Sequence, residues 1–351
     1  MVEVSLKELA EKFHRPPSDV VALDCVRNET RALRMRRGGN QQHVLAGADI
    51  FPAVPLEKLL SADAAEAADL LEPIPFSTKV TGRHASLLAA GVGSAAKMLR
   101  VPETFDVSNK AEITTRLGVD RSGDYRVAAK VVQPGRPKVE AHVLGVAMRE
   151  QVAHGLVGLL PKVGSPAPRA IELSELGVIN AFSNDPVVAM EKRALGLIFF
   201  DYDYSIIALF NGGLISQLRT LRLGASAILK KIQDLLSCDE ETATGVLMDG
   251  AFDITSLIEQ DAREVCGQYV ICRDYMERSE NCHVEALFVS GPIAITKPIL
   301  ASGHIPEEQN DWNPLERFGN VTDELMDPEL RTAPWRWAAA IGGCIGLLEG
   351  E

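Results

Sequence analysis

Two apolar segments, far apart in the chain, each lead into an aspartate and are followed by a second apolar segment. The first unit is 20–23 with Asp24 and a return at 32–35, and the second is 197–200 with Asp201 and a return at 206–210. A buried strand that meets an acid and then turns back is typical of a hairpin with one carboxylate at its mouth. Because the unit occurs twice, we expect two similar domains that face each other across a cleft.

The paired aspartates also indicate a kind of ligand. Mg²⁺ prefers hard oxygen ligands and keeps several waters, so two facing carboxylates suit a magnesium ion bound to nucleotide phosphates. Asp24 and Asp201 are therefore the candidate metal ligands. Either aspartate alone is as well explained by a turn at the end of a strand, where this residue type is common. Because both aspartates occur in the same kind of strand–turn–strand unit, we favour the interpretation that they face a common cleft.

The charge of the chain limits its partners. At 351 residues the chain is long enough for two or more domains, and its formal net charge of −12 argues against nucleic acid or anionic lipid as a partner. A local basic group on the first return strand is interpreted as a solvated strand face. It consists of Arg31, Arg34, Arg36 and Arg37.

The cysteines and the apolar segments of the chain indicate the cellular compartment in which the protein is expected to work. The six cysteines form neither a Cys-x-x-Cys pair nor a regular framework, which favours free thiols in a reducing cytosol over disulfides or a zinc site. No signal-peptide pattern is visible at the N-terminus. The longest apolar segment, 337–348, is too short to cross a bilayer. We therefore expect a cytoplasmic protein without a membrane span.

Further along the chain, apolar periodicity and turn residues predict the remaining elements. A short helix at 5–13 ends before Pro16 and Pro17, and a small inserted module precedes the second unit. The other predicted elements are strands at 125–132, 139–148 and 285–290, and helices at 109–117, 149–160, 254–278 and 335–348.

This order of elements resembles the actin-like ATPases, and within them the PilM proteins of type IV pilus assembly and their relative FtsA. The matching features are Asp24, Asp201, Gly291, the segment Asn313-Pro314-Leu315 and the closing helix that starts at Trp337. The resemblance implies an α/β fold, actin-like and duplicated from a ribonuclease H-like unit, with an inserted 1C-type subdomain. Its implied parts are an N-terminal helical extension (1–17), the first domain (18–93, completed by 169–195 and 330–351), the inserted subdomain (94–168) and the second domain (196–329).

The resemblance also implies a nucleotide site, from which this sequence departs. The implied residues are Asp24, Cys25, Asn28, Asp201, Tyr202, Asp203, Tyr204, Gly224 and Gly291. Family members follow each aspartate with glycine and small hydroxyl residues, which let backbone N–H groups approach phosphate. Here the first loop has no glycine, the second has two tyrosines, and Pro292 and Ala225 replace glycines of the family pattern. Glu29 and Asp203 add negative charge, which opposes a triphosphate.

We therefore expect a degenerate nucleotide site with weak or absent ATP hydrolysis, no required cofactor, and at most a weak ATP–Mg²⁺ complex. One alternative is an active actin-like ATPase that holds Mg²⁺ at Asp24 and Asp201 and switches shape or polymerises. A second is an NAD(P)-binding Rossmann enzyme, because 91–96 matches Gly-x-Gly-x-x-Ala. Pro102 leaves only 94–101 for the required helix, so a turn between two strands is the favoured interpretation.

The function that the resemblance implies is that of a cytosolic scaffold. PilM-like proteins bind the cytoplasmic N-terminal peptide of a bitopic inner-membrane protein, PilN, in a groove between the first domain and the inserted subdomain. An extended peptide can add to an exposed strand edge, and the strands within 125–148 offer candidate edges. We expect a protein that is peripheral to the inner membrane through this partner, with self-association as an additional mode of assembly.

Overall fold

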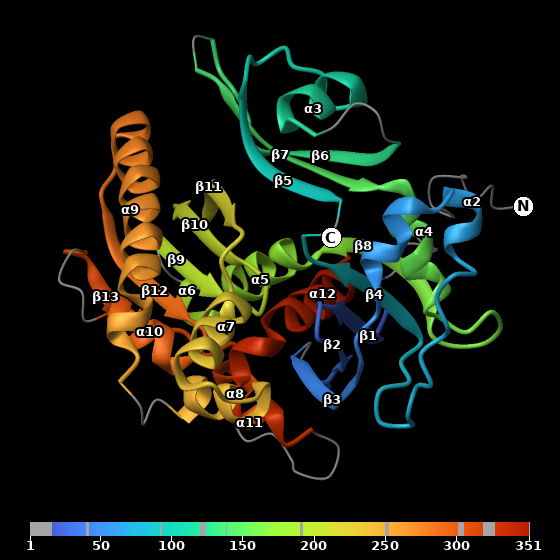
Figure 1. The fold of residues 1–351 in the computed structure, drawn as a ribbon. Helices are drawn as coiled ribbons and strands as arrows, with labels where there is room; N and C mark the ends of the chain where they lie inside the picture. The colour runs from blue at the N-terminus through green and yellow to red at the C-terminus, as the bar shows by residue number, and fades with distance from the viewer. Residues whose placement is uncertain are drawn as a thin grey trace, which may run out of the picture.

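The two strand–aspartate units form two five-stranded sheets with the same topology. In the computed structural model, each sheet has three antiparallel strands followed by two parallel ones, in the orders β3-β2-β1-β4-β8 and β11-β10-β9-β12-β13. The two sheets lie side by side, with a smaller third sheet above them (Figure 1). The repeated order confirms the duplication that the sequence predicts.

The structure describes residues 16–39, 42–91, 93–119, 124–137, 139–189, 192–249, 253–300, 305–318 and 327–350. The helix predicted at 5–13 lies outside these ranges. The strands of the first sheet are β1 (Asp19–Cys25), β2 (Glu29–Arg37), β3 (His43–Pro52), β4 (His84–Ala89) and β8 (Ala167–Leu173). Those of the second are β9 (Ala194–Phe200), β10 (Ser205–Asn211), β11 (Leu214–Leu221), β12 (Val284–Ser290) and β13 (Glu308–Asp311).

Two helices fill the space between the large sheets. They are α5 (Ser174–Ser183) and α12 (Ala338–Glu349), which cross at the centre of Figure 1. Their contact is made by glycines: a Cβ atom on Gly342 would lie 1.7 Å from the backbone oxygen of Gly177. The apolar segment that is too short for a bilayer is therefore a buried core helix, continued from a short turn, η5 (Pro334–Trp337).

The remaining helices cover the outer faces. On the first domain they are η2 (Leu56–Ser61), α2 (Ala64–Ala67) and α4 (Glu150–Gly158), whose apolar side chains share one core with β1 and β4. On the second domain they are α7 (Ala225–Leu236), α8 (Glu240–Asp249), α9 (Thr255–Glu280) and α10 (Ile293–Leu300), which form a separate core against β9 and β12. Short helical turns at α6 (Pro186–Ala189), η3 (Glu316–Phe318) and α11 (Glu329–Thr332) complete the described elements.

The third sheet is antiparallel, in the order β5-β7-β6, with α3 (Lys110–Leu117) packed on it. Its strands are β5 (Ser94–Val101), β6 (Tyr125–Gln133) and β7 (Ala141–Arg149). Residues 94–101 thus form a strand, and Gly91 and Gly93 take positive φ in the preceding turn. The dinucleotide-binding interpretation of 91–96 fails because no helix begins there.

An ion pair connects the third sheet to the second domain. Arg100 on β5 donates to Glu280 at the end of α9 over 3.2 Å, and its guanidinium lies over the ring of Tyr275. The third sheet therefore contacts the second domain as well as the first. Its edge strand β6 borders the first domain.

Candidate functional site

The two aspartates that the sequence pairs do lie close together, but a side chain of the first domain lies between them. Asp24 is the sixth residue of β1, and Asp201 directly follows β9. Both carboxylates are fully buried, and both accept hydrogen bonds from the guanidinium of Arg31. Arg31 lies directly opposite Asp24 in the β1–β2 hairpin, so the hairpin register brings it into the cleft.

The Arg31 guanidinium is held on every side. It binds Asp201 through two N–H groups at 2.9 and 3.2 Å and Asp24 at 3.3 Å. It also donates to a carboxylate oxygen of Glu29 at 2.6 Å and to the backbone oxygen of Arg336 at 2.6 Å. The Arg336 side chain in turn donates to Glu29. A planar guanidinium suits such bidentate contact with carboxylates.

This arrangement corrects one expectation and bears on a second. The interpretation of the arginine group as a solvated strand face is wrong for Arg31, which is only 1% exposed; Arg34 is partly buried and donates to Asp19, and of the group Arg36 is plainly exposed. Between the carboxylates of Asp24 and Asp201, where the sequence suggests a Mg²⁺ ion, lies the guanidinium of Arg31, which supplies a positive charge there. Within the described ranges, no group of three acidic, histidine or cysteine side chains could hold a metal.

Burial dominates the electrostatics around this cluster. It raises the pKa of Asp24, an effect that Arg31 and a 2.6 Å hydrogen bond from Ser174 oppose. It also raises the pKa of Glu175 to about 7, with the nearby carboxylates of Asp24 and Asp201 acting in the same direction. The site thus holds more acidic groups than it has cations to neutralise, which disfavours further negative charge.

The loop after β9 is closed by contacts within the second domain. The backbone N–H of Tyr202 donates to Asp201 over 2.7 Å, and the Tyr202 hydroxyl donates to Glu240 on α8 over 3.0 Å. Tyr204 is buried, and its hydroxyl has no hydrogen-bond partner in the described part of the chain. A Cβ atom on Gly224 would lie 2.3 Å from the backbone oxygen of Tyr202, so the loop rests directly on the start of α7.

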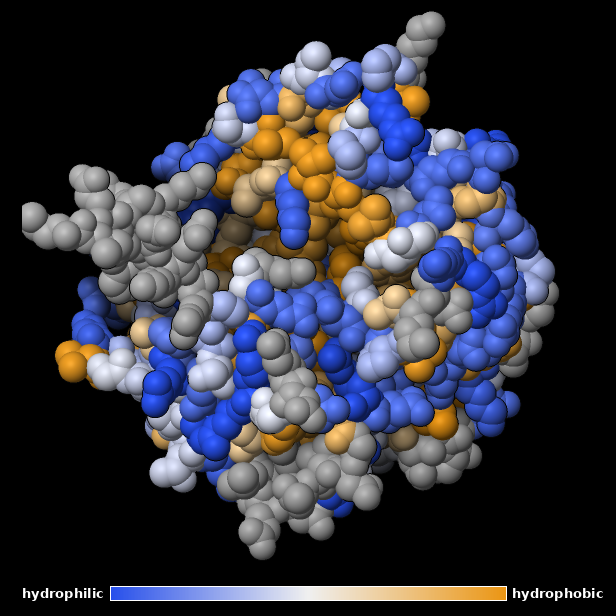
Figure 2. All heavy atoms as spheres, turned by 180° about the vertical axis from the view of Figure 1, so that it is seen from behind, coloured by the Kyte–Doolittle hydropathy of each residue, from blue (hydrophilic) through white to orange (hydrophobic). Residues whose placement is uncertain are grey.

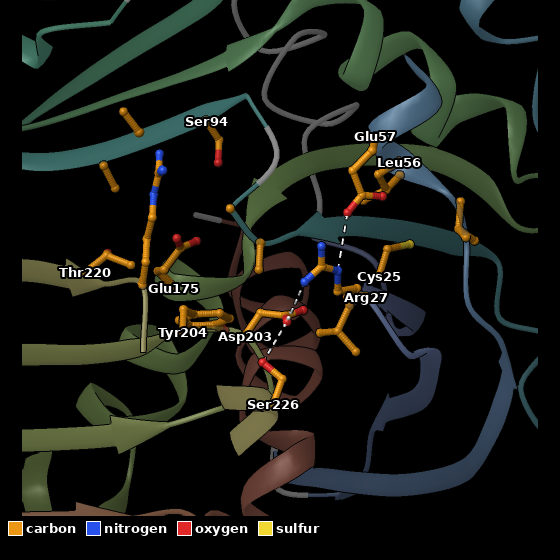
Figure 3. Close-up of a pocket in the computed structure, with 17 residues that line it drawn as sticks. Cys25, Arg27, Leu56, Glu57, Ser94, Glu175, Asp203, Tyr204, Thr220 and Ser226 are labelled. Carbon is orange, nitrogen blue, oxygen red and sulfur yellow. Dashed lines mark hydrogen bonds and ion pairs between the residues drawn. The ribbon is translucent and has the colours of Figure 1, made fainter. Parts of the chain in front are cut away.

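A cavity of about 570 Å³ opens next to the two aspartate loops (Figure 3). Arg27 lies across it, 3.7 Å from Glu57 of the first domain and 3.8 Å from Asp203 of the second. Ser226 also donates to Asp203. The cavity is lined by three carboxylates, those of Glu57, Glu175 and Asp203, and by two arginines, Arg27 and Arg222. This lining offers a polyphosphate little net positive charge.

The predicted nucleotide residues are only partly brought together. Cys25, Asp203 and Tyr204 line the cavity beside the loops, whereas Gly291 lines a separate cavity of about 280 Å³ beside Trp312 and Trp335. Asn28 is exposed and lines neither of these cavities.

A third cavity, of about 440 Å³, lies between the third sheet and the first domain. Figure 2 shows apolar side chains gathered in a hollow on this side of the molecule. Here we call it the groove; it is lined by residues 126–130 of β6, 144 and 146–148 of β7, Ala153 of α4, 171–173 of β8 and Leu176 of α5. The region 125–148, predicted from the sequence as the peptide site, therefore does border an apolar cavity.

Sequence reasoning missed two residues of these sites. Arg31 could have been found from the hairpin register, because a tight turn between β1 and β2 places it opposite Asp24. Glu172 lies on β8, the edge strand of the first sheet, and its neighbours Ile171 and Leu173 line the groove with it. No signal in the sequence marks β8 as an edge strand.

Comparison with known proteins bears on the fold. No protein-family model matches the chain, and no curated protein matches it either. A solved structure of a PilM–PilN type IV pilus biogenesis complex contains a similar chain, at 14% identity and a TM-score of 0.66; the match covers 94% of this chain and 98% of that chain. A Bacteroides thetaiotaomicron protein with an actin-like ATPase fold matches at 9% identity over 90% of this chain and 95% of its own, with a TM-score of 0.47. An archaeal actin homolog matches at 12% identity over 95% of this chain and 100% of its own, with a TM-score of 0.42.

The likeness to the PilM chain and the duplicated sheet order together confirm the predicted actin-like α/β fold with an inserted subdomain. The predicted resemblance to PilM is confirmed at the level of the fold. In the part of the chain that the structure describes, no helix combines the length and the apolar character that a membrane span requires.

Proposed function

We propose that this chain is a scaffold that binds an extended peptide in the groove. The observation that carries the proposal is the apolar groove between the third sheet and the first domain. The resemblance of the sequence to PilM proteins implies a peptide site in this region. The partner is a PilN-like bitopic protein of the inner membrane, and the peptide is its cytoplasmic N-terminal segment. Such docking holds the chain at the cytoplasmic side of a pilus or secretion platform.

Two free sheet edges border the groove and suit an extended peptide. β6 is the last strand of the order β5-β7-β6, and β8 is the last strand of the order β3-β2-β1-β4-β8. Both strands contribute residues to the groove lining. An unpaired strand edge can accept a further strand through backbone hydrogen bonds, while alternate side chains of that strand enter apolar pockets.

We also propose that the nucleotide site is degenerate, so that peptide binding does not depend on ATP. Arg31 lies between the two carboxylates where a magnesium ion would bind, and the neighbouring cavity carries the carboxylates of Glu57, Glu175 and Asp203. A triphosphate without its cation would be repelled there. Self-association is compatible with this role and needs no nucleotide.

The groove proposal predicts a large effect of one substitution on β6. Ala128 is exposed and lines the groove, so Ala128→Glu places a long charged side chain on the groove-facing surface of β6. We expect the affinity for the N-terminal peptide of a PilN-like protein from the same organism to fall at least tenfold, measured by fluorescence anisotropy, because this side chain takes up space that the peptide needs and its carboxylate must lose water when the peptide binds. The matched control is Val131→Glu on the same strand, where the side chain is 43% exposed and lies outside the groove lining. Equal loss in both variants would contradict the groove as the binding site.

The nucleotide proposal predicts no heat on titration of the full chain with MgATP in a calorimeter. Asp201→Ala should behave in the same way, because Asp201 is engaged by Arg31 rather than by a metal. Tight MgATP binding that is lost in Asp201→Ala would overturn the degenerate site and favour an active ATPase. The proposal that the groove binds a peptide would not be affected by that result.

A further inference from the structure

Glu172 is the one carboxylate among the described residues that line the groove. The rest of the lining is apolar apart from Arg126 and Lys130, which both come from β6 on the opposite side. Glu172 lies on β8, so it belongs to the rigid sheet of the first domain rather than to a loop. A single carboxyl group in an otherwise apolar groove favours a ligand that places a cationic or hydrogen-bonding group next to it.

The protein supplies only part of what this carboxyl group requires. One oxygen, Oε1, accepts a hydrogen bond from the hydroxyl of Ser86 on β4 over 2.8 Å. In the described ranges, Glu172 forms no ion pair, and no hydrogen bond to its Oε2 is present. Arg126 is engaged by Glu150 at 2.9 Å. Among the described residues, the negative charge of Glu172 therefore has no counter-ion.

The absence of a counter-ion has a measurable consequence. Burial raises the pKa of Glu172 to about 7, and the hydrogen bond from Ser86 opposes this only in part. Buried charges in proteins are ordinarily paired, because removal from water without a partner is costly. A cation that enters the groove from outside would remove that cost, whereas an apolar side chain in the same place would leave it.

We propose that Glu172 is a specificity-determining residue of the groove and that it receives a lysine or arginine side chain of the bound peptide. This inference rests on the proposed function. The peptide it selects is extended, with apolar side chains that enter the groove and one cationic side chain that reaches the floor at β8. Lys130 and Arg126 on the opposite wall repel a second cation there, so the position of the positive residue is fixed relative to the apolar ones.

The alternative is a protonated Glu172 that donates a hydrogen bond to a backbone oxygen of the peptide. The two cases differ in pH dependence. A carboxylate that pairs with a cation binds the peptide more tightly as the pH rises from 6 to 8, and a protonated carboxyl group binds it less tightly. The other charged or titratable groups that face Glu172 are Arg126 and Lys130 across the groove and the Cys344 thiol on α12. Glu172→Gln isolates the contribution of Glu172 from theirs.

The test uses the full chain and fluorescent peptides with the N-terminal sequence of a PilN-like protein from the same organism. Each lysine or arginine of the peptide is replaced in turn by norleucine or by glutamate. We expect one replacement by norleucine to weaken binding at least tenfold in the native chain and less than twofold in Glu172→Gln. Binding of the unchanged peptide should tighten several-fold from pH 6 to pH 8 in the native chain only. Glu140→Gln, on an exposed residue outside the groove lining, is the charge control.

The outcomes separate this inference from the proposal on which it rests. If the peptide binds, is blocked by Ala128→Glu, and no norleucine replacement discriminates between the native chain and Glu172→Gln, then Glu172 does not select a cation and only this inference fails. Binding that weakens toward pH 8 in the native chain would likewise overturn it in favour of the protonated form. If no peptide binds the native chain at either pH, the scaffold proposal and this inference fail together.

Discussion

Arg31→Met should lower the free energy of unfolding by about 3–5 kcal/mol, the usual cost of removing one partner from a buried ion pair. Methionine fills much of the volume of the arginine stem but supplies no charge. Asp24 and Asp201 would then remain buried without their shared cation, and Glu29 would keep only Arg336. Urea unfolding of the purified variant, followed by circular dichroism, measures the change.

The matched control for this variant is Arg36→Met on the same strand. Its side chain is 52% exposed and lies 3.7 Å from Asp19, and an exposed pair of this kind contributes about 0–1 kcal/mol. Adding Asp24→Asn and Asp201→Asn to Arg31→Met should recover part of the loss, because the repulsion that Arg31 relieved is then absent. Equal stability of Arg31→Met and Arg36→Met would show that the buried cluster does not hold the two domains together.

The loss in Arg31→Met also has a defined pH dependence. Without the guanidinium, the pKa of Asp24 in the folded state rises further above its unfolded value, because burial already raises it. The folded state then binds more protons than the unfolded state, so stability falls as the pH rises. We therefore expect the difference between the variant and the native chain to be larger at pH 8 than at pH 5. A difference that grows toward acid pH would contradict this account.

The sequence predicts much of the fold because each domain is built from local patterns. Apolar runs of strand length and the turns between them identify β1, β2, β9 and β10, and a pattern that occurs twice implies a duplicated fold. The contacts that the sequence does not reveal are those between domains. The hairpin register places Arg31 opposite Asp24, but only the packing of the second domain brings Asp201 within 2.9 Å of it.

The walls of the groove likewise differ in whether the sequence predicts them. Its β6 and β7 walls could be predicted, because the segments 125–132 and 139–148 have the length and composition of strands. The β8 wall could not, because nothing in 167–173 indicates which neighbour that strand lacks. Glu172 becomes significant only when β8 is known to be the last strand of its sheet and to border an apolar cavity.

Gly342→Ala should be as disruptive as the loss of Arg31, although it adds a single methyl group. The Cβ atom would lie 1.7 Å from the backbone oxygen of Gly177 and 2.9 Å from the backbone nitrogen of Ala181. Backbone atoms of α5 cannot move aside as a flexible side chain can, so α5 and α12 must separate. That separation opens the core between both large sheets, in which Trp337 and Ile341 are fully buried. We expect a loss of about 3 kcal/mol or more, at or beyond the upper end of ordinary overpacking.

Gly267→Ala is the control that isolates the close approach of the two helices from the general effect of glycine in a helix. Gly267 lies within α9, and a Cβ atom there would meet nothing within 4 Å. Alanine is a better helix former than glycine, so this variant should gain about 0.5–1 kcal/mol. Urea unfolding of both variants should therefore give changes of opposite sign. If Gly342→Ala instead gained stability, α5 and α12 would have room for a side chain at their crossing, and the tight contact between these helices at the centre of the fold would not exist.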